Sequence, residues 1–175
     1  MKTLSSEKVF SGRIIQVYKD QVLLENGIRT EREVVRHRDA AAVVAVNDKN
    51  EILMVRQYRY AIAQEQLEIP AGLMDEGETP LEAARRELME ETGYEASNWQ
   101  HLLSVYMSPG AHDEEIHIFL ATGLRAAGRQ SLDEDELLTL ETVPLDSILH
   151  NIEAGKIKDG KTVTGILAYR LFAQG

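Results

Sequence analysis

Three glutamates, at positions 87, 90 and 91, are the first residues whose type and spacing suggest chemistry. On a helix, residues three or four apart share a face, so Glu87, Glu90 and Glu91 would present their carboxylates together. Like charges at this spacing destabilise an isolated helix by roughly 0.2–0.5 kcal/mol per pair. Divalent cations that prefer oxygen ligands, such as Mg²⁺, would reverse this repulsion. The pattern indicates either a metal site or, as on most glutamate-rich helices, a solvated acidic face.

The segment that carries these glutamates has a helix signal at each end. Thr79 can cap the N-terminus, Pro80 suits the first helical position, and Glu82 completes a capping box. Gly93 supplies the left-handed residue that commonly follows a helix. A separate apolar face is formed by Leu81, Ala84, Leu88 and Met89. The sequence therefore predicts one helix between Thr79 and Gly93.

The residues around this helix match a longer pattern. Gly72, Glu78 and the segment 86–94 (RELMEETGY) agree at every position with G-x5-E-x7-R-E-U-x-E-E-x-G-U, where U is aliphatic or aromatic. The chain thus resembles the Nudix hydrolases. The resemblance implies an α/β fold, the Nudix α/β/α sandwich with a mixed central sheet. It also implies attack of water on a pyrophosphate that links a nucleoside to another group, with Mg²⁺ or Mn²⁺ as cofactor.

The same resemblance implies a set of metal ligands. Glu87 and Glu91, one turn apart, are the first choice, and the backbone carbonyl of Ala71 also reaches a metal in this family. Glu90 is either a third ligand or a base beside the metal. Because phosphoryl transfer makes little covalent demand on the protein, such groups would act through charge and positioning.

Two other residues of the pattern would organise these carboxylates. Arg86 lies four residues before Glu90 and can pair with it, so we include Arg86 with the catalytic residues. Glu78 would lie at the helix N-terminus, where the helix dipole favours a carboxylate, and a structural role is favoured for it.

A second region of resemblance concerns the substrate. Pro109 lies 16 residues beyond Gly93 in the segment VYMSPG, as in ADP-ribose pyrophosphatases. Similarity to these enzymes extends from about Ser11 to the C-terminus and includes Arg32-Glu33, RQYR at 56–59 and LEIPAG at 67–72. It implies cleavage of ADP-ribose to AMP and ribose 5-phosphate. The alternatives are another nucleoside diphosphate sugar, such as GDP-mannose, or an ADP-ribose-sensing module without catalysis, which the complete pattern disfavours.

The loop that follows Pro109 would supply one more carboxylate. The resemblance implies that Glu114 binds metal or deprotonates water, with Glu115 as the alternative residue for this role. Ser108, at the start of the loop, is assigned to the substrate. Without the family resemblance, the Pro-Gly followed by an acidic pair would indicate only a solvated loop.

The remaining substrate contacts are expected from residues between positions 13 and 59. Arg59 could pair with a phosphate, or it could be a surface arginine beside Tyr58 and Tyr60. Arg13, Ile14, Arg32 and Glu33 match positions that hold the adenine and its ribose in ADP-ribose enzymes. Those enzymes are homodimers whose N-terminal strands complete the partner's site, so Arg13 and Ile14 would act in trans. The alternative for Ile14 is a place in the core.

Two histidines and an acidic run receive no chemical role. No spacing around His112 or His117 supports a zinc site, so they are expected as surface and strand residues. The acidic segment 133–136 is expected to be a solvated turn.

Composition limits the class of protein. With 175 residues, 27% of them charged and 43% hydrophobic, the chain fits a soluble globular protein. The net charge of -10 argues against nucleic acid as a partner, and the lack of a long apolar run argues against a membrane. Zero cysteines and an N-terminus without a secretory signal fit the cytoplasm. The expected partner is a small nucleotide sugar.

The pattern of apolar residues predicts a domain rich in strands. The expected strands cover 13–18, 21–25, 28–36, 40–46, 52–56, 67–70, 102–106, 116–121 and 137–143, with a hairpin turn at Asn26-Gly27. Helices are expected at 144–154 and 161–172. We expect two regions, an antiparallel strand extension at 1–38 that forms dimers and a Nudix domain at 39–175.

Overall fold

The computed structural model describes residues 1–132 and 137–172, and the chain forms two compact units. The first comprises Met1–Asp39 and Val105–Glu115, and the second comprises Ala40–Ser104 and Ile116–Gly175. The loop at 105–115, placed by the sequence in the second region, therefore groups with the N-terminal strands. The acidic segment 133–136 lies outside the described residues.

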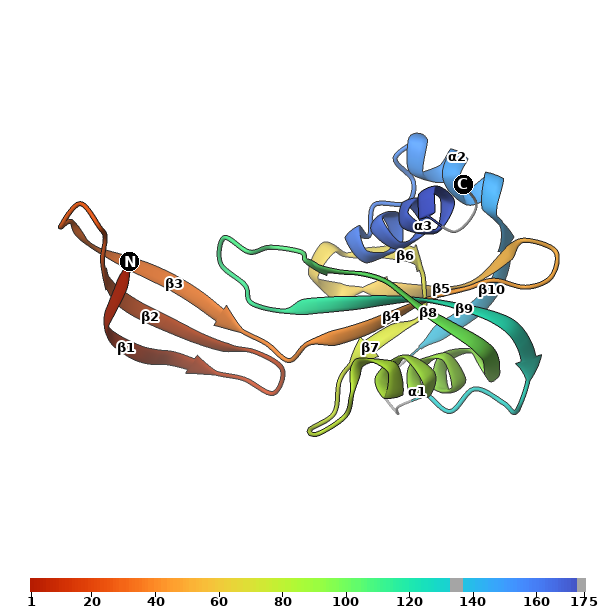
Figure 1. The fold of residues 1–175 in the computed structure, drawn as a ribbon, viewed down its shortest axis with the longest axis horizontal. Helices are drawn as coiled ribbons and strands as arrows, with labels where there is room; N and C mark the ends of the chain where they lie inside the picture. Colours follow the sequence, from red (N-terminus) through yellow and green to blue (C-terminus); the bar gives the residue numbers. More distant parts are fainter. Residues whose placement is uncertain (133–136, 173–175) are drawn as a thin grey trace. The chain divides into compact units, whose positions relative to one another are not determined.

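The second unit is a layered α/β structure (Figure 1). One sheet has the order β7–β4–β9–β8, formed by Ala71–Leu73, Ala40–Ala45, Glu115–Ala126 and Tyr94–Tyr106. The other has the order β10–β5–β6, formed by Leu138–Pro144, Glu51–Arg59 and Gln64–Glu68. Because β4 runs parallel to β9 but antiparallel to β7, the first sheet is mixed, as expected.

Helices cover both sides of these sheets. Helix α1 (Pro80–Thr92) lies on one side, and α2 (Leu145–Glu153) and α3 (Gly160–Phe172) lie on the other (Figure 1). A short 3-10 helix, Tyr60–Ile62, follows β5. Helices α1 and α3 both pack on β4. The expected α/β/α sandwich is confirmed. Among the described residues, no helix is both long and apolar enough to cross a membrane.

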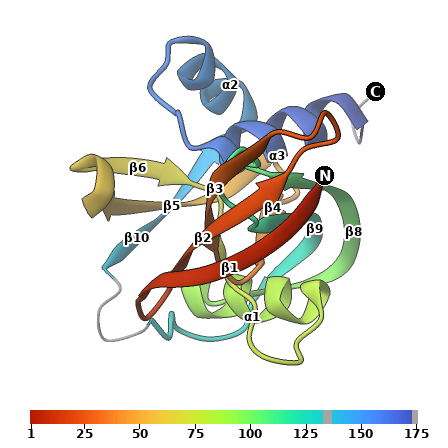
Figure 2. The same cartoon turned by 90° about the vertical axis from the view of Figure 1, so that its left-hand side faces the viewer.

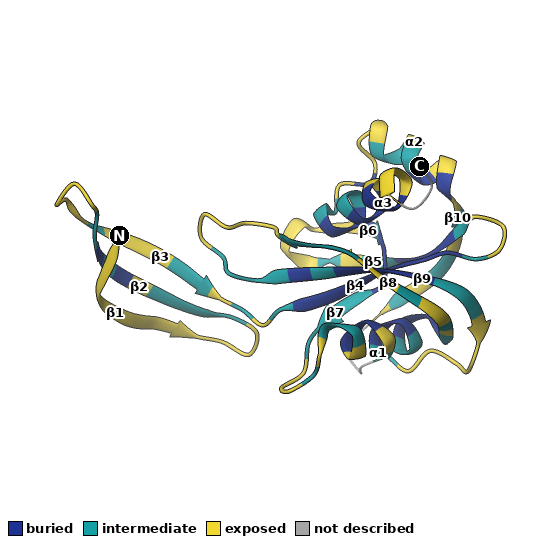
Figure 3. Cartoon of the chain, viewed as in Figure 1, coloured by how far each residue is buried: buried dark blue, intermediate teal, exposed yellow. Residues whose placement is uncertain are grey.

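Strand β4 forms the centre of this sandwich. All of its residues are buried, as the nearly unbroken apolar run predicted for a strand covered on both faces (Figure 3). The core on the α1 side is formed by Ala41, Val43, Ala45, Leu53, Ala83, Ala84, Leu88, Phe119 and Ala121. This packing makes α1 and the strands beside it a firm base for functional groups.

The ends of α1 are those that the sequence predicts. The hydroxyl of Thr79 accepts from the backbone N–H of Glu82, and the Glu82 carboxylate accepts from the backbone N–H of Thr79. Gly93 ends the helix with φ 73°, and a Cβ there would lie 2.7 Å from the carbonyl oxygen of Gly128. Only glycine meets both requirements without strain.

The first unit contains an antiparallel sheet of β1 (Lys2–Ser11), β2 (Gln16–Leu23) and β3 (Arg29–Arg36) (Figure 2). Two differences from the expected strands appear here. Strand β2 is continuous where two strands were expected, and β1 was not expected at all. All residues of β1 are exposed, so the strand lacks the apolar alternation that pattern reasoning needs.

The hairpin between β2 and β3 forms where Asn26-Gly27 predicted it, but its loop has three residues. The N–H of Leu24 donates to the carbonyl of Ile28, at 2.9 Å, which closes a loop over 25–27. Gly27 takes the left-handed conformation with φ 82°, whereas Asn26 does not have positive φ. A two-residue type I′ turn needs positive φ at both positions, so the turn is of the longer type.

Candidate functional site

The glutamates on α1 lie against the short strand β7. Glu87 and Glu91 are only 8% and 4% exposed, whereas Glu90 is half-buried. The backbone N–H of Ala71, in β7, donates to Oε2 of Glu91 at 3.1 Å. A solvated acidic face would not bury two carboxylates, so that alternative is wrong for Glu87 and Glu91. The role of the Ala71 carbonyl stays a prediction.

Gly72 leaves the space that Glu87 occupies. A Cβ at position 72 would lie 2.0 Å from Oε1 of Glu87, far inside van der Waals contact. A side chain there would therefore displace the carboxylate. The first glycine of the sequence pattern is thus explained by close approach of a helix carboxylate to the strand.

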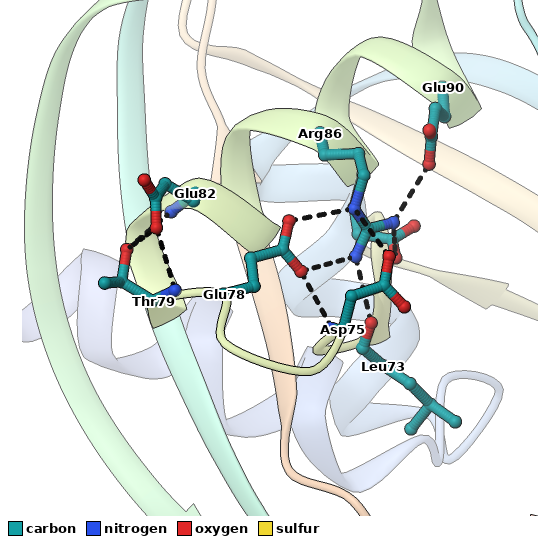
Figure 4. Close-up of polar contacts among 8 residues, drawn as sticks. Leu73, Asp75, Glu78, Thr79, Glu82, Arg86 and Glu90 are labelled. Atoms are coloured by element: carbon teal, nitrogen blue, oxygen red, sulfur yellow. Dashed lines mark hydrogen bonds and ion pairs between the residues drawn. The ribbon is translucent and has the colours of Figure 1, made fainter.

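Arg86 connects the loop before α1 to the carboxylates of the helix (Figure 4). Its Nε and Nη2 donate to the two carboxylate oxygens of Glu78 at 3.0 and 2.9 Å. Its Nη1 donates to Glu87 at 2.6 Å and to Glu90 at 3.0 Å. Nη2 also donates to the carbonyl of Leu73 at 2.9 Å. The expected pairing with Glu90 is confirmed, and the bonds to Glu78, Glu87 and Leu73 are additional.

These contacts set the charge of the site. The pKa of Arg86 is raised, chiefly by its hydrogen bonds to Glu78, and the pKa of Glu78 is lowered, chiefly by Arg86. One positive charge therefore stands among Glu78, Glu87 and Glu90. The excess of carboxylate oxygens is the donor set that Mg²⁺ and Mn²⁺ prefer, and the space at Gly72 lets one of them reach the strand. The residues fit a divalent metal ion.

Arg59 belongs to a separate buried ion group. Its Nε and Nη2 donate to the two oxygens of Glu68, at 2.8 and 2.6 Å, and Lys161 Nζ donates to the same carboxylate. Glu68 is 1% exposed. Burial disfavours its charge, but Arg59 and Lys161 outweigh that effect and lower its pKa. Arg59 and Lys161 line a pocket of about 530 Å³ together with Ile62, Gln64, Gln66, Glu68, Lys158 and Asp159.

The sequence reasoning missed Glu68 and Lys161. The available signal was a charged residue inside the apolar strand segment LEIP, which requires a cationic partner once it is buried. The contact of Arg59 with Glu68 also shows that Arg59 is not simply a surface arginine.

The residues expected to bind adenine and ribose all lie in the first unit. Arg13, Arg32 and Glu33 are exposed. Ile14 is 49% exposed, so the alternative that it belongs to the core is wrong. Nη1 of Arg32 donates to the carbonyl of Glu31 at 2.8 Å. Their substrate contacts remain predictions.

The loop with Ser108 and Glu114 also lies in the first unit. Ser108 is exposed, and its carbonyl accepts from the N–H of Ala111 and His112. Glu114 precedes β9 and lies near His37 and His112, whereas Glu115 is the first residue of β9. The expectation that His112 is a plain surface residue is wrong, because its side chain is 21% exposed and clusters with two others. His117 is a strand residue, as expected.

Comparison with known proteins connects this geometry to a family. A family model described as NUDIX domain matches residues 36–164, and one described as nucleoside diphosphate sugar hydrolase N-terminal domain matches residues 1–35. A crystal structure titled ADP compounds hydrolase is similar, with a TM-score of 0.86 and 28% identity. That match covers 99% of this chain and 95% of the other.

Curated relatives match nearly the whole chain. A methanol dehydrogenase activator of Bacillus methanolicus is 44% identical, and an ADP-ribose pyrophosphatase of Bacillus subtilis is 42% identical. Each alignment covers 94% of this chain and 90% of the relative. A GDP-mannose pyrophosphatase of Citrobacter koseri is 35% identical over 92% of this chain and 91% of its own length.

We predict that Glu78→Gln lowers the free energy of unfolding by about 1 kcal/mol at neutral pH, because it removes a charged acceptor of Arg86. Because the pKa of Glu78 is lower in the folded state than in the unfolded state, its carboxylate stabilises the folded protein at pH values above the unfolded pKa. This stabilisation is lost as the pH falls through the folded-state pKa. The difference from wild type should therefore shrink near pH 3. Urea denaturation at the two pH values measures it, with Glu76→Gln, an exposed residue of the same loop, as control. A difference independent of pH would contradict the assignment.

Proposed function

The chain belongs to the Nudix family of hydrolases, and we propose that it cleaves ADP-ribose to AMP and ribose 5-phosphate with Mg²⁺ or Mn²⁺ as cofactor. The observation that carries this proposal is the pair of buried carboxylates, Glu87 and Glu91, held on one side of α1 against β7. Relatives at 42% and 39% identity that are named ADP-ribose pyrophosphatase support the substrate.

In this proposal Glu87 and Glu91 hold the metal, with Glu90 and the carbonyl of Ala71 beside them. The bound metal would neutralise phosphate charge and lower the pKa of the attacking water. Arg86 keeps Glu87 and Glu90 in place through its hydrogen bonds. Glu90 acts either as a third ligand or as a base. The carboxylate of Glu114 takes the proton of the attacking water or binds metal, with Glu115 as the alternative.

The substrate would be held by the remaining predicted residues. Arg59 has donors beyond the two that bind Glu68, and it lines the pocket near Lys158 and Lys161, so it can also pair with a phosphate. The adenine and its ribose would contact Arg13, Ile14, Arg32 and Glu33, and Ser108 would contact the substrate from its loop.

We propose that the active form is a homodimer in which Arg13 and Ile14 act on the partner's substrate. Residues 1–38 would then be a dimer-forming strand region and 39–175 the catalytic domain. Strand β1 is exposed along its whole length, and Leu4, Val9 and Phe10 are exposed apolar side chains. An exposed edge strand with apolar side chains can pair with another chain. A cytoplasmic location stays a prediction from the sequence.

The second candidate substrate is GDP-mannose, which the Citrobacter relative's name favours. Hydrolysis of a panel of nucleotide sugars with Mg²⁺, followed by chromatography of the products, separates the candidates. Fastest turnover of ADP-ribose supports the proposal, and faster turnover of GDP-mannose would replace it. No turnover of any member would favour a sensing module.

We predict that Glu91→Gln lowers kcat at saturating Mg²⁺ by about 10²–10³-fold while the protein stays folded, because the amide keeps the shape but loses the charge. Circular dichroism and ADP-ribose turnover measure the two effects. Glu153→Gln, an exposed residue at the end of α2, is the control and should behave as wild type. Near-normal turnover of Glu91→Gln would refute the metal role.

We predict that Arg32→Ala raises the KM for ADP-ribose about tenfold with little change in kcat, because a contact to the base is made equally in the ground state and the transition state. Arg29→Ala, an exposed arginine of the same strand, is the control. If KM for ADP-ribose stays unchanged, the base-binding assignment is wrong.

We predict that Phe10→Asp converts the dimer to a monomer, because a charge on β1 opposes burial of this strand. Analytical ultracentrifugation measures the mass, and Leu171→Asp, at an exposed apolar position on α3, is the control that should remain dimeric. A wild-type protein that sediments as a monomer would contradict the homodimer.

A further inference from the structure

Two histidines and a glutamate meet in the first unit, and no role in the proposed reaction explains the histidines. Ligand atoms of His37, His112 and Glu114 all lie within 4.8 Å of one another. Nδ1 of His37 lies 3.4 Å from Oε1 of Glu114, and Nδ1 of His112 lies 3.8 Å from Oε2. Neighbouring ligands of a tetrahedral zinc ion, at bond lengths of about 2.0–2.1 Å, are about 3.4 Å apart. Small side-chain rotations would bring the three groups onto one ion.

The backbone fixes the distance between the two histidine segments. The N–H of Val35 donates to the carbonyl of Ala111 at 2.7 Å, and the N–H of Asp113 donates to the carbonyl of Val35 at 3.2 Å. The Asp113 carboxylate accepts from the backbone N–H of His37 at 3.0 Å and from Arg36 at 2.8 Å. These bonds join the end of β3 to the residues on both sides of His112. The cluster is therefore held in place without a metal.

Nδ1 of His37 lies 2.7 Å from the carbonyl oxygen of Arg38, and it is the same nitrogen that lies 3.4 Å from Glu114. A metal bound at Nδ1 would replace this carbonyl contact, so His37 would give up one backbone contact for the ion.

The surroundings favour a cation. The side chains of His37, Glu114 and His112 are 11%, 16% and 21% exposed, so an ion there would be partly shielded from water but still reachable. The pKa of Tyr106 is raised chiefly by the charge of Glu115, and the charges of Asp39 and Asp113 act in the same direction. The segments 36–39 and 113–115 carry four carboxylates, Asp39, Asp113, Glu114 and Glu115, against the two arginines Arg36 and Arg38, so negative charge predominates along them.

We propose that His37, His112 and Glu114, none of which belongs to α1, form a binding site for a transition-metal ion such as Zn²⁺. Imidazole ligands suit zinc and its neighbours, whereas Mg²⁺ prefers oxygen alone, so the two groups of ligands differ in the metal they select. If Glu114 acts on water as in the proposed function, zinc at this site holds that carboxylate and inhibits hydrolysis. This consequence rests on the proposed function, whereas the metal site itself does not.

Calorimetric titration tests the site. Protein stripped with a chelator is titrated with ZnCl₂ in excess Mg²⁺, which competes with Zn²⁺ for the carboxylates of α1. Wild type should bind one Zn²⁺. His37→Asn and His112→Asn should each lower the affinity for Zn²⁺ by at least about tenfold. Removal of a residue that only orients a ligand already costs that much affinity, and removal of the ligand itself should cost no less. His150→Asn, an exposed histidine on α2, is the control that should bind as wild type.

A Co²⁺ titration gives an independent readout. Bound Co²⁺ should produce visible absorption in wild type that both cluster variants lose, and circular dichroism shows whether the variants are folded. If wild type binds no Zn²⁺, or if both folded variants bind as wild type, the proposal is wrong and the cluster is only a hydrogen-bonded anchor of the loop.

Turnover of ADP-ribose tests the consequence. Zn²⁺ at the concentration that fills the calorimetric site should lower the turnover of wild type, while His112→Asn keeps its Mg²⁺-dependent turnover and resists Zn²⁺. Equal inhibition of both would refute the link to Glu114. No turnover by wild type in Mg²⁺ would instead refute the proposed function, and the titration would still decide the metal site.

Discussion

The acidic face of helix α1 depends on several carboxylates being held around one guanidinium, that of Arg86. Arg86 donates to Glu78, Glu87 and Glu90 and also to the carbonyl of Leu73. Without this charge the carboxylates would repel one another and turn toward solvent. A lysine could not replace the arginine, because the planar fork with five donors serves partners in several fixed directions at once. One side chain thereby joins the loop before α1 to the face that would bind metal.

The strand beside the helix determines how these carboxylates lie. Strand β7 pairs with β4, whose residues are all buried, so the backbone near Ala71 has little freedom to move. The N–H of Ala71 fixes Glu91, and the missing side chain of Gly72 admits Glu87. A site built on packed strands and a capped helix keeps its geometry better than one built on loops. This rigidity suits a reaction in which position and charge provide most of the acceleration.

The charge of the whole molecule makes local cations necessary. A net charge of -10 would repel a pyrophosphate, so the protein must attract it with placed positive groups. In the proposed function a bound divalent metal would be one source, and the pocket with Arg59, Lys158 and Lys161 would be another. Glu68 is the buried acceptor that holds Arg59 and Lys161. The loop with Glu114 belongs to the first unit, where His37 and His112 lie near Glu114 and Arg36 pairs with Asp113.

The sequence by itself determined the structural features that depend only on residues close together along the chain. The capping residues, Gly93 and the spacing of Glu87, Glu90 and Glu91 predict α1 and its acidic face, because helix periodicity and caps are local properties. The apolar run at 40–46 likewise predicts a strand buried on both faces. The Nudix pattern identified the family for the same reason, since its residues lie within one short segment.

The tertiary structure alone decided the contacts between distant segments. The partners of Arg59, the approach of Glu87 to Gly72 and the meeting of His37 with His112 and Glu114 join residues far apart in the chain or on different strands. Strand β1 could not be predicted from the sequence pattern, because it is held by backbone pairing with β2 and not by burial of apolar side chains. Such contacts depend on strand order and register, which no local pattern contains.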